Sequence, residues 1–210
     1  MSENKKIIAV HKSREILLDI LYSRGLDTSE YSGFNINEIH AMVINNQLDI
    51  LLKSKNEGST KKVYVKYYLD KKIVAQNLYD IIEDLFNIES ILDIQDDLVI
   101  IIKDEPNDTL KNLQRTIFEH DNIYVTIINI ERLQFNITKH SLVPTHRILT
   151  EKETKDFRTK YNIVSDKNIP EISRFEPISQ VMGIRPGEIF EITRASKTSI
   201  NSLFYRICSQ

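Results

Sequence analysis

The chain has 210 residues and a net charge of −2, so it is not a polycation that binds nucleic acid by charge alone. Hydrophobic residues make up 41% and charged residues 28%, an ordinary balance for a soluble globular protein. We expect no membrane contact, because no run approaches the roughly 18 apolar residues of a membrane span and the N-terminus lacks a signal-peptide core. The single cysteine, Cys208, excludes an internal disulfide framework.

The first third of the chain predicts two helices followed by two strands. Apolar residues at helical spacing predict a helix over residues 11–24, with Gly25 just past its end. Asn37 is suited to cap a second helix, because its side chain can accept a backbone N–H. Residues 48–54 and 62–69 predict two strands, the second with alternating apolar positions.

The middle of the chain alternates between strand and helix patterns. A polar turn over residues 55–61 joins the first two strands, and residues 71–87 then predict a helix. Residues 98–102 and 123–128 are almost wholly apolar, which is typical of strands buried on both faces. A helix over residues 106–119 separates them. This alternation predicts an α/β layer with some parallel pairing.

The last seventy residues carry the clearest local signals. Thr150 and Glu153 form a capping box, which predicts a helix to about residue 161. A second short helix over residues 177–182 begins with proline and stops at Gly183.

The final predicted elements are a turn and two strands. The turn Arg185-Pro186-Gly187-Glu188 has proline and glycine at its central positions, as type II turns prefer. Residues 188–194 and 202–208 then predict two paired strands, which makes this part a compact α+β module.

Four blocks in this region, residues 136–146, 183–188, 194–198 and 205–208, carry a family resemblance. In order and spacing they resemble the small shared subunit of multi-subunit, DNA-dependent RNA polymerases. This is the fifth-numbered subunit of the eukaryotic enzymes, which has a shorter counterpart in the archaeal enzyme. The resemblance covers residues 136–210, and four ordered blocks are far more specific than one short motif.

The resemblance implies two domains and a non-catalytic role. An α/β jaw domain, a mixed sheet with flanking helices, would occupy residues 1–136. A small α+β assembly domain, closed by an antiparallel strand pair, would occupy residues 137–210. The assembly domain would dock on the largest polymerase subunit, and the jaw domain would help to form the lower jaw around downstream DNA. We expect no cofactor, no metal and no homo-oligomer.

Ten residues match the family in the carboxy-terminal blocks, and the resemblance implies that they face other polymerase subunits. They are His140, Pro144, His146, Arg185, Gly187, Arg194, Ser196, Thr198, Tyr205 and Arg206. Gly187 and Arg194 could equally have local roles in the turn and the hairpin. Two positions depart from the family pattern: Glu176 replaces an aspartate, and Lys197 replaces an acidic residue.

The resemblance also places one loop near downstream double-stranded DNA, which it would contact weakly and locally. The loop follows the strand at 98–102 and opens the next helix, where free N–H groups favour a phosphate. Its candidate donors are Lys103, Asn107, Thr109 and Lys111. Three acids in the same segment would repel phosphate: Asp104, Glu105 and Asp108.

Two other functions compete with the polymerase interpretation. A restriction-type nuclease would need an aspartate and an acidic-x-Lys pair on adjacent strands to hold Mg²⁺. Asp49 and Lys66 have suitable positions, but Tyr64 stands where the second acid belongs. The other alternative is a soluble adaptor that carries only the assembly module.

Two further candidates have simpler explanations. The acids of residues 93–97 could form a cation site, although a solvated connection is the simpler interpretation. Cys208 ends a strand without an obvious basic partner and is a weak candidate nucleophile. A cellular polymerase subunit would work in the nucleus. A subunit encoded by a large DNA virus would work in the host cytoplasm or the virion.

Overall fold

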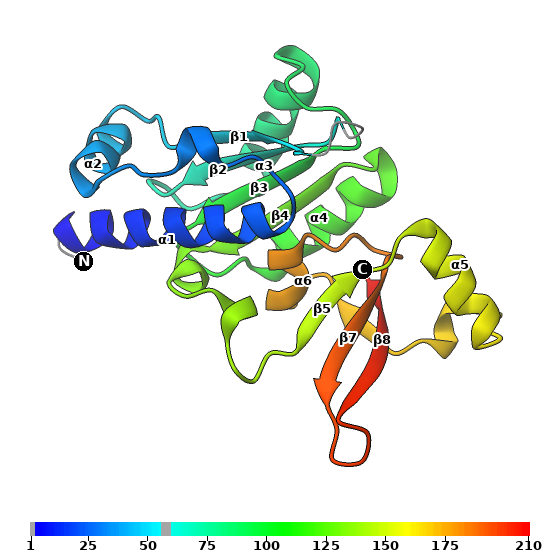
Figure 1. Ribbon diagram of the computed structural model, residues 1–210. Helices are drawn as coiled ribbons and strands as arrows, with labels where there is room; N and C mark the ends of the chain where they lie inside the picture. The colour runs from blue at the N-terminus through cyan, green and yellow to red at the C-terminus, as the bar shows by residue number, and fades with distance from the viewer. Residues whose placement is uncertain (1–2, 56–59) are drawn as a thin grey trace. The chain divides into compact units, whose positions relative to one another are not determined.

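The structure is a computed structural model that describes residues 3–55 and 60–210 (Figure 1). The chain divides into two compact units, Met1–Asn136 and Ile137–Gln210. The predicted turn over residues 55–61 includes residues 56–59, which lie outside the described residues. Among the described residues, none of the helices combines the length and apolar character that a bilayer crossing requires.

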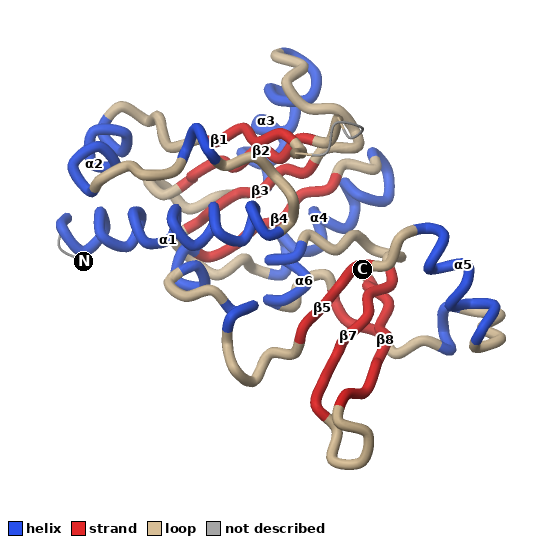
Figure 2. The backbone as a smooth tube through the Cα atoms, viewed as in Figure 1, coloured by secondary structure: helices blue, strands red, loops and turns tan. Residues whose placement is uncertain are grey.

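The amino-terminal unit is built on a four-stranded sheet in the order β1-β2-β3-β4. β1 pairs antiparallel with β2, whereas β2, β3 and β4 are parallel (Figure 2). The predicted α/β layer with parallel pairing is therefore confirmed. The elements are α1 (Glu3–Ser23), η1 (Ser29–Tyr31), α2 (Ile36–Ile44), β1 (Ile50–Lys53), β2 (Lys62–Tyr68), α3 (Ala75–Ile82), η2 (Glu83–Ile88), β3 (Asp97–Ile102), α4 (Asp108–Asp121), β4 (Tyr124–Asn129) and η3 (Ile130–Leu133).

Helices cover both faces of this sheet, so β3 and β4 are buried along their whole length. Leu98, Ile100 and Ile102 of β3 pack into one core with apolar residues of α3 and α4. The alternate residues Val99 and Ile101 are equally buried on the opposite face, which α1 crosses (Figure 1). Burial on both faces explains why these strands are continuous apolar runs.

The first helix is longer than predicted, because α1 begins at Glu3 and not at residue 11. Ile7 and Val10 are buried and extend the apolar stripe by two turns towards the N-terminus. Lys5 and Lys6 precede this stripe and weaken its pattern in the sequence. The predicted end is confirmed, since Gly25 follows the helix with φ of +86°.

The cap of α2 is Asn35, and the prediction of Asn37 was wrong. The Asn35 side chain accepts the N–H groups of Asn37 and Glu38 at 2.9 and 3.0 Å. Glu38 in turn accepts the Asn35 N–H at 2.7 Å, which completes a capping box. The sequence offered two asparagines two residues apart, and only the reciprocal acid three residues further on distinguishes them.

The helix predicted over residues 71–87 is shorter and has two parts. α3 begins only at Ala75, and the chain continues as a π-helix, η2. Lys71 and Lys72 therefore lie in the connection between β2 and α3. The predicted strand over residues 48–54 is likewise reduced to β1.

Two of the acids in residues 93–97 are buried, which contradicts the prediction of a solvated connection. Asp96 is 2% exposed, and its carboxylate accepts the N–H groups of Lys62 and Asp93 at 2.7 and 2.8 Å. Asp96 thereby holds the turn before β3 against the start of β2. Its role is structural.

Asp97, the first residue of β3, forms a buried ion pair at the same edge of the sheet. It is 1% exposed, and its Oδ2 lies 2.8 Å from Arg24 Nη2 and 3.0 Å from Lys61 Nζ. Arg24 directly follows α1, so this contact fixes the end of the helix to the start of the central strand.

The carboxy-terminal unit contains a second mixed sheet, in the order β5-β7-β8-β6. β7 is antiparallel to both β5 and β8, whereas β6 is parallel to β8. The predicted antiparallel pair is therefore confirmed, but β5 and β6 were not predicted. The elements are η4 (Ile137–Lys139), β5 (Thr145–Ile148), α5 (Glu151–Lys160), η5 (Asp166–Asn168), β6 (Glu171–Ser173), α6 (Pro177–Met182), β7 (Ile189–Ala195) and β8 (Asn201–Ser209).

The alternation predicted for β7 separates two small cores. Ile189 packs with Phe157 of α5 on one face. Phe190 and Ile192 pack with Cys208 on the other face, next to the end of α6. Each face thus has its own helix, and the unit buries both sides of a short sheet.

The predicted local signals of this unit are also present. Thr150 and Glu153 form the capping box of α5, and the Thr150 N–H bond lowers the pKa of Glu153 to about 2 with help from Arg147. Gly183 ends α6 with φ of +65°. Gly187 has φ of +88°, and the Glu188 N–H donates to the Arg185 carbonyl at 3.1 Å, which closes the predicted turn.

Neutralising the buried carboxylate should destabilise the amino-terminal unit. We expect Asp97→Asn to lower the free energy of unfolding by ~3 kcal/mol, because Arg24 and Lys61 would be left without their shared anion. Urea unfolding of the full chain, followed by circular dichroism, measures this change. Asp93→Asn is the control: Asp93 is 82% exposed and 3.8 Å from Lys62, so we expect a loss below ~0.5 kcal/mol. Equal effects of the two variants would contradict this role for Asp97.

Cys208 should be unreactive in the folded chain. Its thiol is 2% exposed, and burial raises its pKa to about 12, so the reactive thiolate is scarce at neutral pH. We expect iodoacetamide at pH 8 to alkylate the native protein at least about a hundredfold more slowly than the urea-unfolded chain. Mass spectrometry of timed samples measures both rates. Comparable rates would show that the thiol is accessible and return Cys208 to consideration as a nucleophile.

Candidate nucleic-acid and subunit interfaces

The parallel pairing of β2, β3 and β4 brings three chain segments to one edge of the amino-terminal sheet. Tyr68 of β2 pairs with Ile102 of β3, which pairs with Asn129 of β4. The segments that follow these residues therefore leave the sheet side by side. The predicted DNA-proximal loop is the segment that follows β3.

The structure places the four DNA-proximal candidates in one short segment at the start of α4. Lys103 and Thr109 are exposed, and Lys111 Nζ lies 3.5 Å from Asp108 within the helix. Asn107 has a local role, since its side-chain oxygen caps α4 by accepting the Leu110 N–H at 2.9 Å. Lys103 and Thr109 are thus the candidates best placed to face a ligand.

The acids of this segment are partly neutralised by neighbouring groups. Glu105 forms a two-pronged ion pair with Arg132, with both N···O distances at 3.0 Å. The Asn129 amide also donates to Glu105 at 3.4 Å, and Asp108 is near Lys111. The repulsion of phosphate that the sequence suggested is therefore weaker than a count of acids implies.

Further lysines lie at the same edge, and sequence reasoning missed them. Lys71 and Lys72, which follow β2, line one shallow hollow with Lys103 and Asn107. Lys5 and Lys6 of α1 line a larger cavity of about 770 Å³ next to it, which also includes Lys103. The signal was available in principle, because lysines that directly follow parallel strands gather at one edge.

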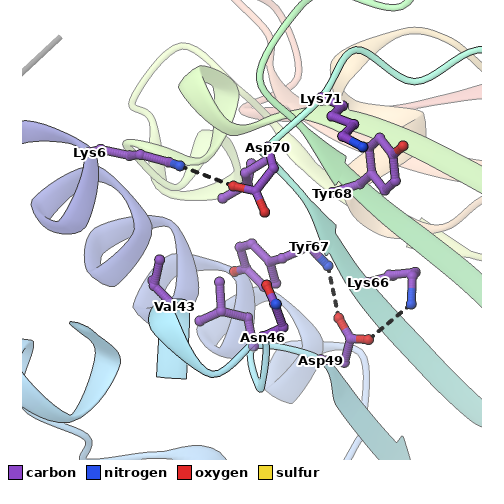
Figure 3. Close-up of a pocket in the computed structure, with 11 residues that line it drawn as sticks. Lys6, Val43, Asn46, Asp49, Lys66, Tyr67, Tyr68, Asp70 and Lys71 are labelled. Carbon is purple, nitrogen blue, oxygen red and sulfur yellow. Dashed lines mark hydrogen bonds and ion pairs between the residues drawn. The ribbon is translucent and has the colours of Figure 1, made fainter. Parts of the chain in front are cut away.

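The residues proposed for a nuclease site do meet, but they satisfy one another. Figure 3 shows the cavity of about 330 Å³ that contains Asp49, with Lys66 and the Tyr67 N–H both directed at its carboxylate. The distances are 3.3 Å to Lys66 Nζ and 3.1 Å to the Tyr67 N–H, and the Tyr64 hydroxyl donates at 3.0 Å. Asp49 therefore ties β2 to the chain before β1.

The same cavity does not supply a second carboxylate beside Asp49. Asp70, its other acid, pairs with Lys6 at 3.4 Å (Figure 3). Within residues 3–55 and 60–210, no three His, Cys, Asp or Glu side chains are grouped to hold a metal ion. The geometry thus gives the nuclease hypothesis no support.

In the carboxy-terminal unit, several of the predicted interface residues maintain the fold. The Tyr205 ring packs 4.4 Å from Phe157, and its hydroxyl donates to Glu191 at 3.0 Å. Burial, with this carboxylate nearby, raises the pKa of Tyr205 to about 12. Arg206 donates to the Glu171 carbonyl at 3.0 Å and so links β8 to β6.

The turn residues and both histidines of this set also make local contacts. The Gly187 N–H donates to the Cys208 carbonyl at 2.9 Å, so the turn is fastened to β8. His146 contacts the Pro144 carbonyl through Nδ1 at 2.7 Å, and desolvation lowers the pKa of its imidazole. His140 is exposed, and its Nδ1 accepts the Leu142 N–H at 3.2 Å.

The outer end of the β7–β8 hairpin presents the remaining candidates. Arg194 lies over the Phe204 ring at 4.6 Å, on the exposed part of β7. Ser196 and Thr198 stabilise the hairpin loop through the Thr198 N–H, which donates to Ser196 Oγ at 3.3 Å. Lys197 is exposed between them. This end of the hairpin therefore offers cations and hydroxyls to a partner.

Comparison with known proteins identifies the carboxy-terminal region. Residues 135–208 match the family described as RNA polymerase Rpb5, C-terminal domain. DNA-directed RNA polymerase subunit Rpo5 of Pyrococcus abyssi is 43% identical over 74 residues, which are 35% of this chain and 89% of that protein.

Eukaryotic relatives extend the similarity along the chain. Subunit 5B of DNA-directed RNA polymerases IV and V of Arabidopsis thaliana is 24% identical over 216 residues, covering 99% of this chain and 94% of that protein. Subunit RPABC1 of DNA-directed RNA polymerases I, II and III of Caenorhabditis briggsae is 33% identical over 75 residues, or 36% of this chain and 35% of that protein. The chain therefore belongs to the RNA polymerase Rpb5 family, with the C-terminal domain of that family at residues 135–208.

Proposed function

We propose that this protein is a non-catalytic, structural subunit of a DNA-directed RNA polymerase. The observation that carries the proposal is the family match of residues 135–208, together with a polymerase-subunit relative that aligns with 99% of the chain. Nucleotide addition would belong to the large subunits of the complex. The protein would work in the nucleus of a cell, or in the host cytoplasm or virion of a large DNA virus.

The carboxy-terminal unit is the proposed assembly domain, and its partner is the largest polymerase subunit. The outer end of the β7–β8 hairpin supports this assignment, because Arg194 and Lys197 are exposed there without a structural role as extensive as that of Arg206. An acidic surface of the partner would complement them.

The amino-terminal unit is the proposed jaw domain, next to downstream duplex DNA. Support comes from the exposed Lys103 and Thr109 at the start of α4 and from the pairing of Glu105 with Arg132, which reduces the negative charge beside them. Residues 139–210 carry 12 basic and 8 acidic residues, so the rest of the chain has 16 basic and 22 acidic residues and a charge of −6. DNA contact by this unit would therefore be local and weak, and the polymerase would have to hold the DNA in place.

The docking surface can be tested by charge reversal at the hairpin. We expect Arg194→Glu with Lys197→Glu to lower the amount of largest subunit that co-purifies with the tagged protein by about tenfold or more, because like charges at an interface repel. Quantitative mass spectrometry of the pull-down measures this. Lys152→Glu with Lys155→Glu changes the charge equally on exposed positions of α5 and is the control. Full retention of the hairpin variant would refute docking through this end.

If the wild-type protein brings down neither large subunit, the polymerase assignment itself fails. The soluble-adaptor alternative would then replace it.

The proposed position beside DNA can be tested by crosslinking from Thr109. A photocrosslinker on Thr109→Cys should label the downstream duplex in an elongation complex, because Thr109 is exposed in the first turn of α4. Asp121→Cys, at the last residue of the same 14-residue helix, lies about 20 Å away and is the matched control. Denaturing gels of labelled DNA detect the product. Equal labelling from both positions, or none from Thr109, would contradict the proposed orientation.

A further inference from the structure

Three exposed lysines that the family resemblance did not indicate together meet at the carboxyl edge of the parallel sheet. Lys71 and Lys72 follow β2, and Lys103 follows β3. The last residues of the two strands, Tyr68 and Ile102, are paired neighbours. All three lysines line the same hollow at the start of α4. We call them the lysine surface.

The charge of the lysine surface is not cancelled by its surroundings. None of the three lysines forms an ion pair with any residue of the described ranges. In contrast, the nearby acids Asp70 and Glu105 are engaged by Lys6 and Arg132 at 3.4 and 3.0 Å.

Asp104 remains as an acid beside the hollow, against three lysines. The local field is therefore positive on a unit whose overall charge is negative. Such a contrast directs a polyanion to one place on the surface.

The shape of the hollow indicates what kind of anion fits it. Its volume is only about 10 Å³, which is less than the roughly 30 Å³ that one water molecule occupies in the liquid. A nucleotide base or a metabolite ring cannot enter. Lysines spread over a shallow surface act as point charges on phosphates and do not recognise bases. This favours the outside of a nucleic-acid backbone over a small phosphorylated ligand.

We propose that Lys71 and Lys72, together with Lys103, contact successive backbone phosphates of downstream duplex DNA. The inference rests on the proposed function and extends the DNA-facing surface from the β3–α4 loop to the β2–α3 connection. The contact is electrostatic and independent of sequence. It aligns the duplex along the carboxyl edge of the sheet, and the acidic remainder of the unit disfavours other orientations.

The test measures how salt affects DNA binding by the whole polymerase. Reconstituted polymerase carrying Lys71→Gln with Lys72→Gln is titrated with a fluorescent downstream duplex at several KCl concentrations. Each lost phosphate contact should reduce the slope of log Kd against log salt by about one, so we expect a decrease of about two.

The matched control carries Lys12→Gln with Lys53→Gln. Both lysines are exposed, and Lys53 ends β1 opposite the start of β2, at the other edge of the sheet. We expect this control to keep the wild-type slope. Unfolding midpoints and the amount of large subunit recovered establish that both variants are folded and incorporated.

Three outcomes decide the question. A smaller slope for Lys71→Gln with Lys72→Gln, and an unchanged slope for the control, support the lysine surface. An unchanged slope for both, or an equal decrease for both, overturns it while the proposed function stands. Failure of the wild-type chain to assemble with the large subunits overturns the proposed function and this inference with it.

Discussion

The parallel pairing of β2, β3 and β4 is the constraint on which the amino-terminal unit depends. Parallel strands need crossover connections, and here α3 and α4 provide them on one face while α1 covers the other. Because all three strands run in one direction, their carboxyl ends share one edge. Charged segments distant in the sequence, after Tyr68 and after Ile102, become neighbours there for this reason alone.

The two edges of this sheet have opposite electrostatic organisation. At the edge where the strands begin, the acids Asp96 and Asp97 are buried and fully engaged by backbone N–H groups and by Arg24 and Lys61. At the edge where the strands end, lysines are exposed and the acids are drawn into pairs with other cations. A buried charge has to be paired to be tolerated, whereas an exposed one can remain available to a partner. Stability and partner contact are thereby assigned to different ends of the same strands.

The sequence predicted the long-period features well, because burial leaves a direct pattern in it. The apolar runs of β3 and β4, the alternation of β7 and the capping box at Thr150 all correspond to observed elements. The errors arise where a residue's environment comes from distant segments. The three-residue strand β6 exists because β8 pairs with it, and the burial of Asp97 depends on Arg24, 73 positions earlier. No local window contains that information.

The candidate sites show the same division between local and distant information. The sequence located the loop after β3, but it could not show that Asn107 is used as a helix cap or that Lys71 and Lys72 lie beside it.

The carboxy-terminal unit illustrates how a residue match to a family can have two meanings. Tyr205, Arg206 and Gly187 make internal contacts that hold β8, β6 and the turn together, so a protein with this fold needs them whether or not a partner is bound. Arg194 has no comparable backbone contact, and its main neighbour in the fold is the Phe204 ring. Lys197, which replaces an acidic residue of the family pattern, adds a second cation to the same end of the hairpin. Any partner surface that accepts this hairpin must therefore accommodate more positive charge than the family pattern requires, which favours a correspondingly acidic surface on the subunit that binds it.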